Sequence, residues 1–291
     1  MVTSQAVIHG PRNRLLSFDE SEHPVALQLG GSDPAELAEA TRIAADFGYD
    51  EINLNVGCPS DRVQSGCFGA VLMKSPDLVA DCVSAMISTS NVEVTVKCRI
   101  GVDDQIPAEV LPAFLEKVSA AGVNRFAIHA RMAWLKGLSP KENREVPPLD
   151  YALVYQMKRD FPHLHLSING GVKTLDEAAS HLDQGMDGVM IGRAAYHDPS
   201  SVLLDLDARF HGGQTRTAEA VVHAMLPYID THLQSGGKLH SVTRHMLGLF
   251  NGRPGARSWR QILSTEGTRE GAGPEVVLRA LAEVGPAAQA A

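Results

Sequence analysis

Short apolar segments alternate with segments of helical periodicity along most of the 291-residue chain, and this alternation constrains the fold more than any other feature. A strand followed by a helix and then another strand specifies a parallel sheet with crossover helices. Two architectures satisfy the pattern: a doubly wound open sheet and a closed eight-stranded barrel. The six expected strands lie at about residues 25–29, 51–56, 94–99, 125–130, 164–168 and 188–191.

The expected helices fall between these strands and beyond the last one. Ser32-Asp33-Pro34 is typical of a helix start, with a capping residue followed by a proline that the first turn tolerates. From about residue 215 only helical spacing remains, so we expect a barrel domain over residues 1–214 and a helical domain over residues 215–291. The expected helices cover about 32–48, 75–87, 103–121, 151–161, 174–184, 221–233, 242–250 and 274–284.

Polar side chains and glycines stand at the C-terminal ends of many of the expected strands. In a barrel the functional residues come from several strand ends, whereas an open sheet binds its ligand at one switch point. The pattern therefore favours a TIM-type (β/α)8 barrel. Since only six strands are evident, we expect a barrel that is incomplete at its N-terminus, with residues 1–8 as the tail of one more strand.

Cys58 stands at the end of the second expected strand, between Gly57 and Pro59. Residues 51–56 alternate apolar side chains with asparagines, of which Asn55 is the last, as in a strand with one polar face. We expect Gly57 to provide an unusual backbone angle and Pro59 to end the strand. A free cysteine is commonly a small buried apolar residue. The neighbouring asparagines and the sharp end of the strand favour a chemical role for Cys58 instead.

Other strands end in residues that suit an anionic heterocycle. Lys97 and His129 interrupt otherwise apolar strands, and a lysine that points inward is costly to bury without a partner. Gln28 can donate and accept hydrogen bonds at once, as the edge of a heterocycle requires. Asn169-Gly170-Gly171 and Gly192-Arg193 end the last two strands, where barrels commonly bind phosphate with backbone N–H groups.

The composition excludes several classes of protein. The chain is 44% hydrophobic and 21% charged, as in a foldable globular protein, and no apolar run approaches the ~18 residues of a membrane span. The N-terminus lacks the pattern of a secretory signal. Cys58, Cys67, Cys82 and Cys98 form no Cys-x-x-Cys pair, so we expect no metal site and a reducing, cytoplasmic location.

One segment is positively charged although the net charge of the chain is −8. Residues 238–260 contain five basic side chains and no Asp or Glu. A solvated helix face is the plain interpretation, but most surface helices mix both signs, so the segment favours an anionic partner. The five basic residues are Lys238, Arg244, Arg253, Arg257 and Arg260.

Taken together, these residues resemble the tRNA-dihydrouridine synthases, flavoenzymes that reduce specific uridines in tRNA. The matching motifs are NLNVGCPSDRV, TVKCRIG, IHAR, SINGG and MIGRAA, which begin at residues 53, 95, 128, 167 and 190. SPKENREVPPLDY and TRHMLGLFNGRPGARSWR resemble the A-type bacterial subfamily, which acts on uridines 20 and 20a. The resemblance covers the chain from Met1 to about Leu263.

The resemblance implies an oxidoreductase that binds FMN at the mouth of a barrel and binds tRNA through a helical C-terminal domain. NADPH would reduce the flavin, the flavin would pass a hydride to C6 of the uracil ring, and Cys58 would protonate C5 from the other side. A thiol suits this task because it is mostly protonated at neutral pH yet can release its proton. The target base in the D-loop must leave the stacked interior of the tRNA.

The family motifs also assign residues to the cofactor and to the RNA. Asn55 would lie near the target base, and Arg131 is a further candidate for RNA or flavin phosphate. We expect the protein to act as a monomer in the cytoplasm. The implied FMN contacts are Gln28, Lys97, His129, Asn169, Gly170, Gly171, Gly192 and Arg193, and the implied tRNA contacts are Asn55, Leu138, Lys141, Arg257 and Arg260.

The N-terminus departs from the family pattern. The family has a first strand that places an Ala-Pro-Met motif against the flavin, followed by a helix, and this chain begins after both. We therefore expect the chain to fold poorly or to hold FMN weakly, although the residues for the chemistry remain.

Two rival interpretations remain open. A flavin barrel that reduces a free pyrimidine, similar to dihydroorotate dehydrogenase, would not need the basic segment at 238–260. A catalytically silent RNA-binding remnant would bind tRNA without forming dihydrouridine. Salt-dependent binding would argue against the first, because phosphate contacts release counterions, and formation of product would exclude the second.

Overall fold

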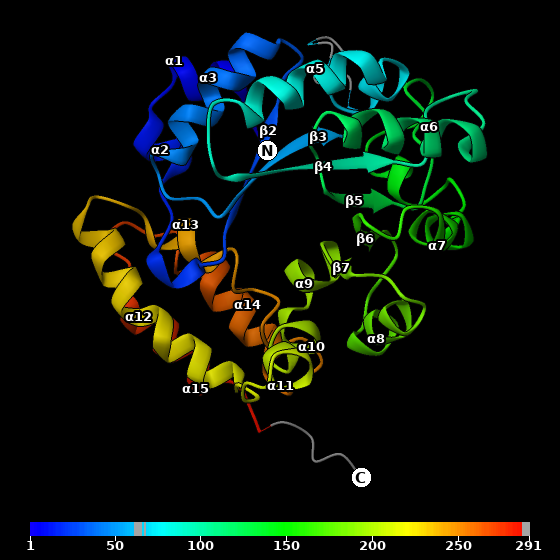
Figure 1. Ribbon diagram of the computed structural model, residues 1–291. Helices are drawn as coiled ribbons and strands as arrows, with labels where there is room; N and C mark the ends of the chain where they lie inside the picture. The colour runs from blue at the N-terminus through cyan, green and yellow to red at the C-terminus, as the bar shows by residue number, and fades with distance from the viewer. Residues whose placement is uncertain (61–65, 67, 287–291) are drawn as a thin grey trace. The chain divides into compact units, whose positions relative to one another are not determined.

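The chain forms two compact units in the computed structural model, which describes residues 1–60, 66 and 68–286 (Figure 1). The first unit comprises Met1–Gly171 and Ala179–Met190, and the second comprises Val172–Ala178 and Ile191–Ala291. The expected boundary between residues 214 and 215 lies within the second unit. None of the described helices has the length and apolar character needed to cross a membrane.

A parallel sheet of seven described strands forms the centre of the first unit, and its strands follow one another in sequence order. This order, with helices between the strands, is that of a TIM-type barrel and confirms the predicted fold class. The expected tail of one more strand in residues 1–8 is present only at Val2–Thr3, where Val2 pairs with Leu29, and the prediction is wrong for residues 4–8, which belong to the helix Ser4–His9. The strands are β1 (Val2–Thr3), β2 (Ala26–Gly30), β3 (Glu51–Val56), β4 (Glu93–Arg99), β5 (Arg125–His129), β6 (His165–Asn169) and β7 (Gly188–Met190).

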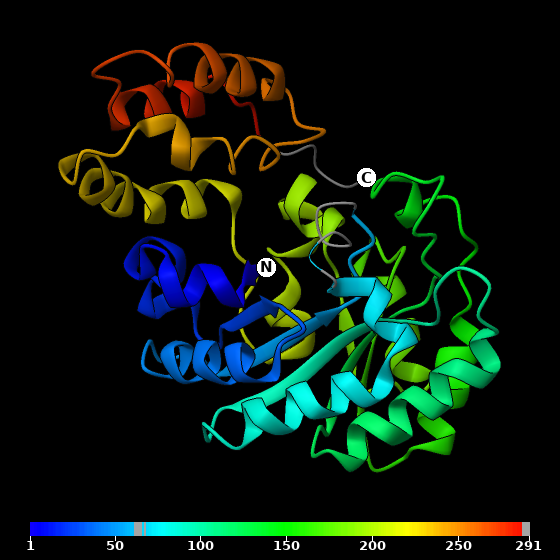
Figure 2. The ribbon, with the colours of Figure 1, turned by 90° about the horizontal axis from the view of Figure 1, so that it is seen from above.

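The α-helices between β2 and β7 agree with those expected from the sequence, whereas the two α-helices within residues 4–16 were not expected. The Asp33 side chain accepts a hydrogen bond from the Glu36 N–H and caps α3, and Pro34 occupies the first turn. Figure 2 shows α3, α5 and α6 side by side along one flank of the sheet. The helices are α1 (Ser4–His9), α2 (Arg12–Leu16), η1 (Glu20–Glu22), α3 (Pro34–Ala45), η2 (Gly69–Lys74), α5 (Pro76–Ile87), α6 (Pro107–Ala120), η3 (Glu142–Arg144), α7 (Tyr151–Asp160) and α8 (Leu175–Asp183).

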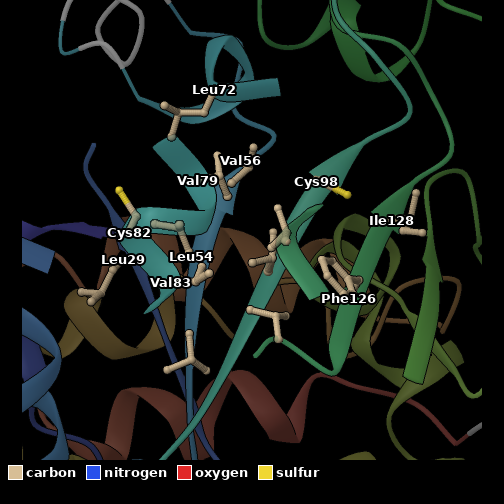
Figure 3. Close-up of a cluster of buried hydrophobic side chains, with 14 of the residues drawn as sticks. Leu29, Leu54, Val56, Leu72, Val79, Cys82, Val83, Cys98, Phe126 and Ile128 are labelled. Carbon is tan, nitrogen blue, oxygen red and sulfur yellow. The ribbon is translucent and has the colours of Figure 1, made fainter. Parts of the chain in front are cut away.

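One face of the sheet is apolar and packs against the helices. Leu54, Val96 and Phe126 are register partners on β3, β4 and β5, and each is fully buried. Figure 3 shows this cluster, in which Val79 and Val83 of α5 lie against the strands. Because side chains alternate between the two faces of a strand, this register sends the intervening residues to the opposite face.

The second unit is helical and has a core of its own. Trp259 is fully buried, its ring meets that of Phe250 edge to face at 4.8 Å, and its Nε1 donates to the Met246 carbonyl at 3.1 Å. Its helices are α9 (Arg193–His197), α10 (Pro199–Val202), α11 (Leu206–Phe210), α12 (Ala218–Gln234), α13 (Leu239–Thr243), α14 (Ala256–Thr265) and α15 (Pro274–Ala282).

The basic segment contains one correction to the expected helices. The helix predicted over 242–250 is wrong beyond Thr243, where α13 ends and the chain continues in turns. Gly248 packs so closely that an added Cβ would lie 2.2 Å from the His197 carbonyl oxygen. The sequence spacing also missed α14, which the left-handed Gly255 precedes, with a φ of +82°.

One of the five basic side chains, Arg253, forms an ion pair within the second unit. Arg253 Nη2 donates to Glu219 Oε1 and to the Gly285 carbonyl, both at 2.6 Å. This bond to Arg253 lowers the pKa of Glu219. Because the folded pKa is depressed, the pair stabilises the fold at neutral pH and loses that contribution as the pH falls through the folded pKa.

We expect Glu219→Gln to lower the free energy of unfolding by about 0.5–1 kcal/mol at pH 7, a small value because solvent screens an exposed carboxylate. The Glu219 side chain is 41% exposed. Urea unfolding at pH 7 and at pH 3 measures the effect, which should shrink at pH 3. Glu270→Gln, at an exposed position, is the control. A deficit of equal size at both pH values would contradict the assignment.

Candidate active site

Polar side chains occupy the second face of the sheet in aligned registers. Strands of a parallel sheet are usually apolar on both faces. A polar face therefore indicates that this side of the sheet contacts a polar ligand and not packed helices. The polar face includes four of the eight residues that the sequence assigned to the cofactor, namely Gln28, Lys97, His129 and Asn169. The aligned sets are Gln28, Asn53 and Thr95; Asn55 and Lys97; and Arg99, His129 and Asn169.

The amides on this face are joined side chain to side chain. Asn55 Nδ2 donates to Gln28 Oε1 at 2.7 Å, and Gln28 Nε2 donates to Asn53 Oδ1 at 2.8 Å. Asn53 Nδ2 donates to Thr95 Oγ1 at 2.7 Å, and that hydroxyl donates to Glu51. A fully connected network of this kind fixes the orientation of each amide.

Asn55 also holds the turn that carries Cys58. Its Oδ1 accepts from the backbone N–H groups of Gly57, at 3.1 Å, and Cys58, at 2.9 Å. The Cys58 carbonyl accepts from the Ala70 N–H at 2.8 Å. The expectation for Gly57 is wrong, because its φ lies outside the left-handed region. The turn is formed by the Asn55 side chain and does not depend on glycine's conformational freedom.

Cys58 differs from the other described cysteines in its surroundings. Its thiol is partly exposed and lies 3.5 Å from Ser60 Oγ. Cys82 and Cys98 are fully buried, and burial raises the pKa of each to about 12, so both thiols are inert. Cys67 lies outside the described residues. Among the described cysteines, Cys58 is thus the one whose thiol can reach a ligand.

Arg99 is buried among backbone carbonyls, to which its guanidinium donates. Nε donates to the Gly57 carbonyl at 3.1 Å, and Nη1 donates to the carbonyls of Met132, at 3.0 Å, and Asn143, at 2.8 Å. The residue is only 3% exposed. Burial, and next the charge of Arg144, lowers the pKa of Arg99 to about 10, so it stays charged at neutral pH. Arg99 therefore ties the Cys58 turn to the loop after β5.

That loop has its own centre in Asn143, which is fully buried. Asn143 Nδ2 donates to the carbonyls of Trp134, at 2.9 Å, and Leu138, at 3.1 Å, and its Oδ1 accepts from the Trp134 N–H at 2.7 Å. Leu138 and Lys141, two predicted tRNA contacts, belong to this ordered loop, and Lys141 is exposed. Sequence reasoning missed Asn143, since an asparagine within a long loop carries no distinct signal.

Lys97 supplies positive charge on the polar face. Burial, followed by the neighbouring charge of Arg99, lowers the pKa of Lys97 to about 8. Cys58 has a smaller, opposite effect and raises the pKa of Lys97. A half-buried ammonium of this kind is stabilised by an anionic or electron-rich ligand.

The end of β6 is shaped by glycine. Gly170 and Gly171 have φ values of +110° and +77°, which favour glycine. An added Cβ on Gly170 would lie 2.6 Å from the His129 ring, so the backbone passes directly over that ring. Asn169 Nδ2 donates to the Met190 carbonyl at 2.7 Å and joins the ends of β6 and β7. The two glycines are therefore required because His129, Leu149 and Tyr151 pack directly against this turn.

The first unit thus brings together most of the predicted site. Gly192 and Arg193 belong to the second unit, where they begin α9, so their place beside these residues stays a prediction. Arg131 contributes to the loop after β5, since it donates to the Pro147 carbonyl. The described residues contain no group of His, Cys, Asp and Glu that could hold a metal ion. The predicted site residues of the first unit are Gln28, Asn55, Cys58, Lys97, His129, Leu138, Lys141, Asn169, Gly170 and Gly171.

Comparison with known proteins agrees with this geometry. The family described as "Dihydrouridine synthase (Dus)" matches residues 1–284. A protein of Shewanella oneidensis is 57% identical over 279 residues, covering 95% of this chain and 82% of that protein. One of Vibrio cholerae is 55% identical over 287 residues, covering 98% and 87%.

A protein of Escherichia coli strain K12 is 58% identical over 284 residues, covering 97% of this chain and 81% of that protein. All three relatives carry the name tRNA-dihydrouridine(20/20a) synthase. A match of this length and identity confirms the resemblance seen in the sequence. The chain therefore belongs to the dihydrouridine synthase family, and within it the relatives of the 20/20a type are similar to it over nearly its whole length.

Proposed function

We propose that this chain reduces uridines 20 and 20a in the D-loop of tRNA to 5,6-dihydrouridine, with FMN as cofactor and NADPH as reductant. The observation that carries the proposal is the partly exposed Cys58 thiol, held at a strand end beside the polar face of a family member. When bound, FMN supplies the hydride that reaches C6 of the uracil. tRNA is a cytoplasmic substrate, and we place the enzyme there.

Cys58 supplies the proton that completes the reduction. Its S–H bond breaks, a C–H bond forms at C5 of the uracil, and the thiolate then recovers a proton from water. Hydride and proton together account for the two hydrogens of the product, and NADPH is oxidised. Asn55 and Arg99 hold the Cys58 turn through its backbone, so the thiol keeps a fixed position while the base is exchanged.

Lys97 suits a flavin. Its ammonium would hold the cofactor, and a positive charge beside a flavin favours the reduced, anionic form. His129, Gly170 and Gly171 would also contact the cofactor, and Gln28 would offer the N–H and the lone pair that its bonds to Asn53 and Asn55 leave. Asn169, Gly192 and Arg193 would complete the cofactor site at the last strand ends.

The RNA contacts would come from both units. Asn55 would lie near the target base, and Leu138 and Lys141 lie in the loop that Arg99 and Asn143 order. Arg257 and Arg260 are exposed on α14 of the second unit. Exposed arginines bind phosphate through several N–H donors.

We expect Cys58→Ala to lower the rate of dihydrouridine formation at least about 100-fold, the usual effect of removing a general acid. Binding of tRNA should change less than about twofold, because Asn55 bonds only the backbone of this turn. Mass spectrometry of unmodified tRNA incubated with NADPH, FMN and enzyme measures the product. Cys82→Ala is the matched control, as that thiol is buried.

Two outcomes would oppose the assignment. Equal loss of binding and reduction in Cys58→Ala would indicate a structural cysteine. Salt-insensitive reduction of free uracil or orotate by the wild-type chain would indicate a reductase of free pyrimidines instead.

The affinity for FMN should fall as the pH rises above about 8, by at most tenfold per pH unit, since Lys97 loses its proton there. Below that pH the ammonium is present and the affinity should be constant. Flavin absorbance titrations between pH 6 and 9.5 measure this. Lys97→Met should bind FMN weakly with no such pH dependence, while Lys117→Met, on the exposed side of α6, should behave as wild type. A wild-type profile that is flat to pH 9.5 would contradict the role of Lys97.

Arg99→Lys should lower the free energy of unfolding by about 2 kcal/mol, because an ammonium cannot reproduce a guanidinium fork to several carbonyls. The amide hydrogens of Gly57 and Cys58 should also exchange faster, since Arg99 anchors their turn. Urea unfolding and hydrogen exchange measure the two effects. Arg125→Lys, at an exposed ion pair with Glu93, is the control. Unchanged exchange at the turn would contradict the positioning role.

A further inference from the structure

The second unit carries a hollow of about 420 Å³ whose walls come from α9 and from the basic segment. Its lining includes Tyr196, Arg244, His245, Asn251 and Arg260. We infer that this hollow is a nucleotide-binding subsite, in which Arg244 and Arg260 bind an RNA phosphate and Tyr196 stacks on an unpaired base. The inference rests on the proposed function, and it assigns roles to Tyr196, Arg244 and His245.

The two walls of the hollow are fixed to each other through the backbone. Asn251 Nδ2 donates to the His197 carbonyl at 2.8 Å, and the Ser200 hydroxyl donates to the Leu249 carbonyl. Gly248 allows this close approach, because an added Cβ would lie 2.2 Å from the His197 carbonyl oxygen. The hollow is therefore preorganised, which lowers the entropic cost of binding.

A chain of hydrogen bonds orients the polar groups in the hollow. Arg244 Nε donates to His245 Nε2 at 3.0 Å, so the other ring nitrogen of the neutral imidazole carries its hydrogen. That Nδ1–H then donates to Tyr196 Oη at 2.9 Å, which leaves the phenol hydrogen for an acceptor on a ligand. Arg260 Nη1 donates to Asn251 Oδ1 at 3.0 Å. Each bond uses one N–H of its guanidinium, and a guanidinium has five.

The charge of the lining favours an anion. Among the described residues that form it there are two arginines and no carboxylate. A second hollow of about 660 Å³ in the same unit contains Glu270 beside Lys238 and Arg269, so its charge is mixed. Arg253 forms an ion pair with Glu219 and does not line the smaller hollow. Of the arginines in the basic segment, Arg244 and Arg260 line it together.

The exposed ring of Tyr196 favours RNA as the anion that this hollow binds. Tyr196 is 54% exposed although it is large and partly apolar. Sequence-tolerant single-stranded sites combine a cationic surface with aromatic rings on which bases stack. RNA recognition likewise targets loops whose bases can leave the stack. A free phosphate would use the arginines and the phenol hydroxyl, but the exposed face of the tyrosine ring would add nothing to its binding.

Binding of unmodified tRNA to the full chain, measured at several salt concentrations, tests the subsite. Arg244→Gln should weaken binding about five- to tenfold and reduce the slope of log affinity against log salt by about 0.7–0.9, as loss of one phosphate contact requires. Tyr196→Ala should weaken binding about tenfold, as loss of one stacked base requires, while Tyr196→Phe keeps most of the affinity. Arg216→Gln removes an exposed arginine outside the lining and is the matched control.

The outcome separates this subsite from the proposed function. If the wild-type chain binds and reduces tRNA while Arg244→Gln and Tyr196→Ala behave like Arg216→Gln, the subsite is overturned and the function stands. If the wild-type chain neither binds nor reduces tRNA, both fail. Photocrosslinking of 4-thiouridine-containing tRNA to the wild-type chain is independent of variant folding. Crosslinks in residues 193–197 or 244–260 support the subsite, and crosslinks confined to other residues overturn it.

Discussion

The contacts of the buried Arg99 guanidinium hold together the end of the sheet that carries Cys58. Carbonyls from the Cys58 turn and from the loop after β5 accept its hydrogen bonds, and in its buried position the charge is stabilised only as long as those carbonyls remain in place. The positions of the thiol and of the loop with Leu138 and Lys141 are thereby linked. A single side chain thus sets two parts of the site that lie far apart in sequence.

The same strands serve two purposes because their register is aligned across the sheet. Leu54, Val96 and Phe126 make one face a hydrophobic core, while Asn55 and Lys97 make the other face a polar wall. A shift of one residue in any strand would exchange the two faces, so burial of the apolar set also fixes the polar set. Stability and chemistry are therefore specified by one pattern.

The sequence predicted the strands, most of the longer helices and most residues on the polar face, because period-2 alternation, helical spacing and strand-end motifs are local signals. It could not show that the Asn55 side chain forms the Cys58 turn, which local reasoning attributed to Gly57. The roles of Asn143 and Arg253 also required the structure, since each depends on partners distant in sequence. The motifs thus predicted which residues belong to the site, and the structure showed which hydrogen bonds and ion pairs fix their positions.

The polar network across β2, β3 and β4 has a direction. Glu51 can only accept a hydrogen bond from Thr95, so the hydroxyl must accept from Asn53, and each amide in turn is oriented the same way up to Asn55. The Glu51 carboxylate at the start of β3 thereby determines that the Asn55 side-chain oxygen points toward the Cys58 turn. Reversal of one amide would remove its bonds to both neighbours, so the orientation of each amide between Glu51 and the Cys58 turn depends on the amide before it.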